Sequence, residues 1–175
     1  MRRARAPYGT HGSIASHATA RLAIGRPERL VGVGFRLWLN GLKTGDIRFW
    51  EQAWCTYSSC MGADAAKSAV SELASWVRLI KCHSQRELQT AAPGCDAFCR
   101  DECVAISMIA ACQHNACPAM RACAFTLLGC SVIDEVVEVA ENFAHRLHDA
   151  DQVLSPALTC NPALLTMPAA TAARH

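Results

Sequence analysis

The stretch CDAFCRDEC (residues 95–103) combines three cysteines at every fourth position with four charged residues. On an α-helix, residues four apart lie on one face, one turn above each other, so this spacing predicts a line of three thiols: Cys95, Cys99 and Cys103. Such a line could bind a soft metal ion or take part in thiol redox chemistry. The same face continues into the apolar Ile106, as it would if cysteine served only as a small core residue.

Further cysteines widen the choice of ligands, because the chain contains eleven of them. This odd count prevents complete intrachain pairing. The arginine-rich start lacks the apolar segment of a secretory signal, so we expect a cytoplasmic, reducing location and free thiols. Cu(I) first and Zn(II) second would suit a thiolate set. The predicted metal ligands are Cys95, Cys99, Cys103, Cys112, Cys117 and Cys123.

The four-residue cysteine step of CDAFCRDEC resembles the CxxxC pairs that line the interior of cysteine-rich four-helix bundles of the copper-storage type. The resemblance covers Cys95 to about Cys130, and only CDAFCRDEC keeps the spacing. It implies a helical bundle that holds Cu(I) through thiolates. The chain departs from that family by having no cysteine in its first and last predicted helices.

Other patterns that could carry chemistry are few. Glu141, His145 and His148 share one helix face and form a metal-compatible set, although a solvated helix face with a Glu141–His145 pair explains them as well. The sequence has no CxxC, phosphate-binding glycine loop, GxSxG or HExxH motif, so we expect no enzyme. The charged turn formed by Arg100, Asp101 and Glu102 predicts a salt bridge to a neighbouring helix, and an Arg100 that packed against Cys99 or Cys103 would lower the thiol pKa.

The distribution of charge bears on partners. Residues 1–50 carry nine Lys or Arg and two Asp or Glu, whereas residues 51–175 carry eight and thirteen. The folded body is therefore expected to be mildly acidic and not to bind nucleic acid. The sequence contains no uninterrupted apolar run of about 18 residues, so we expect no transmembrane helix.

Apolar periodicity predicts helices throughout and no strand. We expect an all-α fold, an antiparallel up-and-down bundle of five to six helices with disordered termini. The bundle is assigned to 28–154, between a basic flexible segment (1–27) and a flexible tail (155–175). The expected helices are one that starts near Pro27 and ends at Gly45, followed by 46–61, 64–89, 95–115, one that starts at Pro118 and ends at Gly129, and 131–151.

The second predicted helix carries an apolar seam, which we expect to pack in the core. Its members are Ile47, Trp50, Trp54, Tyr57 and Met61. The same seam offers a contact for a homo-oligomer or a protein partner.

Three functional hypotheses follow from these patterns. The first is a small non-enzymatic protein that binds a soft metal through helical cysteines. The second is a helical interaction or scaffold protein in which cysteine fills the core. The third is a thiol redox sensor.

Overall fold

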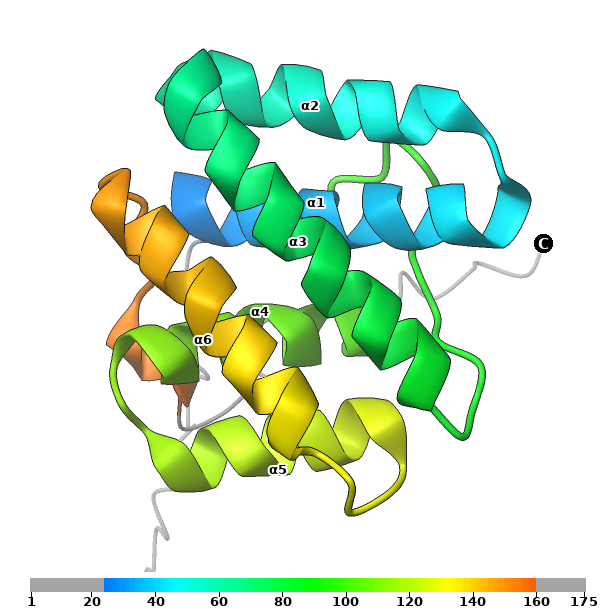
Figure 1. The fold of residues 1–175 in the computed structure, drawn as a ribbon, viewed down its shortest axis with the longest axis vertical. Helices are drawn as coiled ribbons and strands as arrows, with labels where there is room; N and C mark the ends of the chain where they lie inside the picture. Colours follow the sequence, from blue (N-terminus) through cyan, green and yellow to red (C-terminus); the bar gives the residue numbers. More distant parts are fainter. Residues whose placement is uncertain (1–23, 160–175) are drawn as a thin grey trace, which may run out of the picture.

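The computed structural model describes residues 24–159, and in this range the regular structure is entirely helical (Figure 1). This confirms the predicted all-α class. Residues 1–23 and 160–175, which make up most of the two predicted flexible ends, lie outside the described residues. The elements are α1 (Arg26–Thr44), α2 (Ile47–Met61), α3 (Ala63–His83), α4 (Arg100–Gln113), α5 (Cys117–Leu128), α6 (Asp134–Asp149) and the short 3-10 helix η1 (Pro156–Thr159).

The helices form three antiparallel pairs. In the view of Figure 1, α1 and α2 lie along the top and α4 and α5 along the bottom, while α3 and α6 run diagonally across both pairs. The inner helix is α4, which contacts α1, α5, α6 and η1. Every residue from Asp101 to Ala111 is buried, which confirms the predicted central helix. Within the described range no helix is long and apolar enough to cross a membrane.

Several predicted helix ends are confirmed by their capping geometry. The Asp46 side chain accepts a hydrogen bond from the Arg48 amide at 3.0 Å, as an N-cap residue does. Gly45 and Gly129 end α1 and α5 with φ of 73° and 69°, and Gly62 separates α2 from α3. Glycine adopts such left-handed conformations without steric cost.

Other predicted boundaries are wrong. The third helix ends at His83 instead of residue 89, and the fourth begins at Arg100 instead of residue 95. The intervening residues 84–99 form an irregular connection. The sixth helix begins at Asp134, and the Ser131 side chain does not cap it.

The α2 seam is only partly in the core. Tyr57 is fully buried, but the residues Ile47 and Trp54 are 61% and 39% exposed. The buried face of α2 centres instead on Ala53 and Tyr57. The seam prediction therefore fails at Ile47 and Trp54, because α2 is rotated so that the smaller Ala53 faces its neighbours.

The folded body continues past the predicted boundary at residue 154. Leu154 and Leu158 are buried in the core cluster, and the Ser155 amide donates a hydrogen bond to Glu28 Oε1 at 2.7 Å. The start of the predicted tail thus packs against α1 and α4.

Glycines in α1 allow aromatic rings to lie directly on its backbone. A Cβ atom at Gly32 would come within 2.5 Å of Phe98 Cε1, and one at Gly34 would clash with the Tyr57 ring. The Tyr57 hydroxyl donates to the Leu30 carbonyl at 3.1 Å. The ring that lies on Gly32 belongs to Phe98 of the CDAFCRDEC segment.

Candidate functional site

The six predicted metal ligands lie at opposite ends of α4. Cys95 and Cys99 precede the helix, and Cys103 lies in its first turns. The predicted line of three thiols on one helix is therefore wrong, because residues 95–99 are not helical. Cys112 lies nine residues beyond Cys103, about 14 Å along the helix axis at 1.5 Å per residue.

The remaining predicted ligands, Cys117 and Cys123, belong to α5. They lie near Cys112: burial is the main cause that raises the pKa of Cys112, and the neighbouring Cys123 and Cys117 add smaller electrostatic contributions. Among residues 24–159, no three cysteine, histidine or acidic side chains converge in a way that could hold a metal ion.

Burial keeps several thiols protonated at neutral pH. It raises the pKa of Cys103 and of Cys112 to about 12, and that of Cys123 to about 11. Burial also raises the pKa of Cys99. Arg100 is exposed, and neither Cys99 nor Cys103 has the lowered pKa that packing against it would have produced. A protonated thiol is a poor nucleophile and a poor metal ligand until it loses its proton.

The acidic residues of CDAFCRDEC bind arginines inside the protein. Arg36 on α1 donates from Nε to Glu102 Oε1 at 2.7 Å and from Nη2 to Oε2 at 3.1 Å. These two side chains are 3% and 0% exposed. Glu102 also accepts hydrogen bonds from the backbone amides of Ala91 and Cys99, at 3.1 and 2.8 Å. The salt bridge predicted for the charged turn is thus present.

The same arginine holds the connection before α4 from inside. Its Nη1 donates to the Cys95 carbonyl at 2.6 Å, and its Nη2 donates to the Ala97 carbonyl at 2.7 Å. The guanidinium also lies over the Phe98 ring, 5.2 Å from its centre. Arg36 and Glu102 together therefore shape residues 91–99.

A second ion pair holds the connection at its other end. Arg86 donates to both oxygens of Asp101, at 2.9 and 2.7 Å, and the Gln89 amide donates to the same carboxylate at 2.8 Å. Burial alone would raise the pKa of Asp101, but these hydrogen bonds outweigh it and hold the pKa below its usual value. Asp101 and Glu102 of CDAFCRDEC therefore stabilise the fold through ion pairs of their buried carboxylates.

A polar cleft lies beside Cys112, between the end of α4 and α6. Its volume is about 500 Å³, and its lining includes Cys112, Glu141, His145 and His148. The predicted Glu141–His145 pair is not observed, because His145 Nε2 lies 3.6 Å from the Asp149 carboxylate. The solvated-face interpretation of this helix agrees with the exposure of all three α6 side chains.

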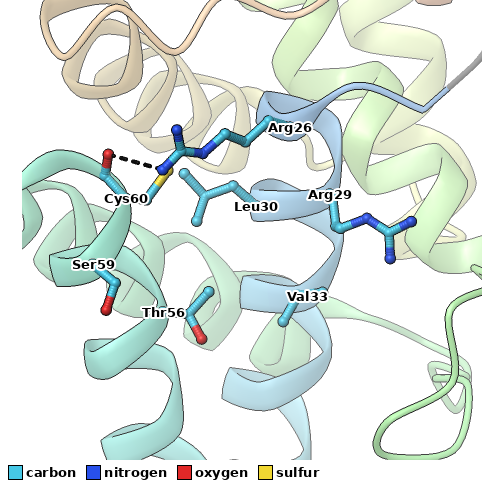
Figure 2. A pocket seen from close by; sticks show the side chains of 7 residues that line it. All are labelled: Arg26, Arg29, Leu30, Val33, Thr56, Ser59 and Cys60. Atoms are coloured by element: carbon cyan, nitrogen blue, oxygen red, sulfur yellow. Dashed lines mark hydrogen bonds between the residues drawn. The ribbon is translucent and has the colours of Figure 1, made fainter.

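A smaller groove of about 230 Å³ lies between α1 and α2 (Figure 2). On the α1 side the lining is Arg26, Arg29, Leu30 and Val33, and on the α2 side it is Thr56, Ser59 and Cys60. Arg26 reaches across one end of the groove and donates to the Cys60 carbonyl at 3.4 Å. This combination of cationic and apolar side chains can receive an anionic group with a short apolar part.

This groove was not predicted from the sequence, although Arg26, Arg29, Leu30 and Val33 follow the i, i+3, i+4, i+7 spacing of one helix face. The role of Arg36 was not predicted either, although Arg36 is a lone charge among apolar residues of α1, where burial requires a carboxylate partner. Comparison of the chain with protein-family models, with curated proteins and with solved structures found no match.

Proposed function

We propose that the protein is a non-enzymatic helical interaction protein in which cysteines fill the core. The placement of the predicted ligands supports this most directly, since Cys103 and Cys112 are separated along α4 and carry protonated thiols. Two of the four charged residues of CDAFCRDEC, Glu102 and Asp101, are paired with Arg36 and Arg86. What remains accessible for binding includes the groove between α1 and α2.

A metal titration tests this proposal. The reduced full-length protein is titrated with Cu(I) and, separately, with Zn(II) against a competing chelator. We expect the chelator to retain the metal, and we expect a thiol reagent to reach Cys103 and Cys123 only after unfolding, because both are buried. Stoichiometric transfer of metal from the chelator to the folded protein would contradict the proposal.

Binding of a soft metal is the second candidate, and one observation favours it at a single place. Cys112 and Glu141 line the same cleft, and Glu141, Cys123 and Cys117 add smaller electrostatic contributions to the burial that raises the pKa of Cys112. Rotation of these side chains could supply thiolate and carboxylate ligands at the α4–α5 end. Under this candidate, C112A combined with C123A abolishes metal transfer, whereas the control pair C55A and C82A, both at exposed sites, leaves it unchanged.

A further inference from the structure

We propose that the groove between α1 and α2 is a binding site for a short-chain aliphatic monocarboxylate, with Arg26 as the residue that binds the carboxylate. The inference rests on the proposed function only in that the protein acts by binding and not by catalysis. The inference adds the chemical class of the ligand and the groove in which it binds.

The cationic group of the site is Arg26, because its guanidinium makes a longer hydrogen bond within the protein than that of Arg29 does. Among the described residues, Arg26 makes one hydrogen bond, to the Cys60 carbonyl at 3.4 Å, which is longer than the usual 2.7–3.2 Å range for N–H donors. A guanidinium has five N–H donors. Most of the donors of Arg26 are therefore available to a ligand.

Arg29 contributes less, because it already has a partner. Its Nη1 donates to Asp96 Oδ1 at 3.0 Å, and Figure 2 shows its side chain pointing away from the groove. A single available guanidinium matches a singly charged, planar carboxylate, which it can bind with two parallel hydrogen bonds. A doubly charged phosphate would need a second available cation, and the other cation among the described lining residues, Arg29, is paired with Asp96.

The apolar part of the ligand would lie on Leu30 and Val33. Both side chains extend into the space between α1 and α2 in Figure 2. On the opposite side, the Thr56 hydroxyl donates to the Gln52 carbonyl at 2.7 Å. This leaves the Thr56 methyl group, the stem of Arg26 and the two aliphatic side chains as a surface for an alkyl chain.

The size of the groove limits the chain length. The groove has a volume of about 230 Å³. This volume lies below the roughly 300–1,000 Å³ of sites for drug-sized ligands. Hexanoate, with a carboxylate and a five-carbon alkyl chain, is the probe that fits this volume.

The alternative role for Arg26 is purely structural. The Cys60 carbonyl belongs to the last turn of α2, where a cationic side chain stabilises the helix end. That role predicts a loss of stability when Arg26 is replaced, but no dependence of ligand binding on this residue. The two roles can therefore be separated by measuring affinity and melting temperature on the same variants.

The experiment is a titration of the uniformly ¹⁵N-labelled full chain with sodium hexanoate, followed by amide chemical shifts, against sodium chloride at equal ionic strength. We expect saturable shifts at Leu30, Val33, Thr56 and Cys60. R26Q should raise the Kd at least tenfold and R26K should give an intermediate value, because lysine keeps the charge but loses the planar fork. The matched control R78Q replaces an exposed arginine on α3 and should leave the Kd unchanged.

Three results would overturn the site. The first is an absence of saturable shifts in the groove, and the second is hexanol binding as tightly as hexanoate. The third is a lower melting temperature of R26Q with an unchanged Kd, which would mean that Arg26 only caps the end of α2. If hexanoate does not bind and the protein takes no metal from the chelator, this site is wrong but the proposed function stands. If hexanoate binds and the protein does take metal from the chelator, the proposed function is wrong but this site stands.

Discussion

Replacing Glu102 with glutamine should destabilise the protein strongly, because it leaves the charge of Arg36 buried without compensation. Glu102 is fully buried and accepts four hydrogen bonds: two from the Arg36 side chain and one each from the Ala91 and Cys99 amides. Glutamine preserves the shape of the side chain but removes the negative charge and replaces one acceptor oxygen with a donor group.

The expected loss is about 3–5 kcal/mol in the free energy of unfolding, the usual cost of removing one partner from a buried ion pair. The exposures of 3% and 0% for the two side chains mean that solvent screening does not reduce this value. For a chain of 150–250 residues, such a loss corresponds to a fall in melting temperature of roughly 6–20 °C.

The assay is urea denaturation monitored by circular dichroism, together with amide hydrogen exchange of the folded protein. E102Q should lower the midpoint and accelerate exchange at Ala91 and Cys99, the amides that lose their acceptor. D96N provides the control. Asp96 forms an ion pair with Arg29, but its side chain is 95% exposed, so the pair should contribute little to the free energy of unfolding. R36M combined with E102L removes both charges, but it should not recover the stability, because the Ala91 and Cys99 amides and the Cys95 and Ala97 carbonyls then lose their partners.

A loss of less than about 1 kcal/mol for E102Q would refute this reasoning. It would mean that water or a rearranged connection solvates Arg36.

Four further outcomes are expected. The pKa of Asp101 is held below its usual value, so its stabilisation is complete above about pH 3.9 and is lost as the pH falls through the lower folded-state pKa. In D101N, the midpoint of urea denaturation should therefore depend less on pH in the acid range. Burial raises the pKa of Cys103 and Cys112 to about 12, above the unfolded value of about 8.5. The urea midpoint should thus fall as the pH rises from about 8.5 towards 12, and less steeply in C103A. Y57F should cost about 0.5–1.5 kcal/mol in urea denaturation, because it removes the buried bond to the Leu30 carbonyl. G34A should cost about 1–3 kcal/mol in the same assay, since the added methyl group would meet the Tyr57 ring.

Local signals were sufficient where a helix end is determined by its own residues. Asp46, Gly45 and Gly129 cap or end helices through their own backbone and side-chain geometry, and their sequence positions predict this. The apolar run after Cys103 likewise predicts the buried α4, because no polar residue other than Ser107 interrupts it.

The connection between α3 and α4 could not be predicted locally. Asp101 and Glu102 are typical first-turn helix residues in any sequence, and nothing local indicates that they accept the amides of Gln89 and Ala91. Those bonds replace the helical ones that periodicity predicts for these residues. The misplacement of the cysteines follows from the same cause, since Cys95 and Cys99 belong to the connection and not to the helix.

The aromatic contacts on α1 have a consequence for the order in which the chain can fold. Gly32, Gly34 and Gly41 each reduce intrinsic helix stability by about 1 kcal/mol relative to alanine, so α1 depends on rings that cover them. Those rings come from Phe98, Tyr57 and Trp50, and all three follow α1 in the sequence. During synthesis α1 leaves the ribosome first, yet it gains its full set of contacts only after Phe98 has emerged. An isolated α1 peptide should accordingly be largely non-helical in water.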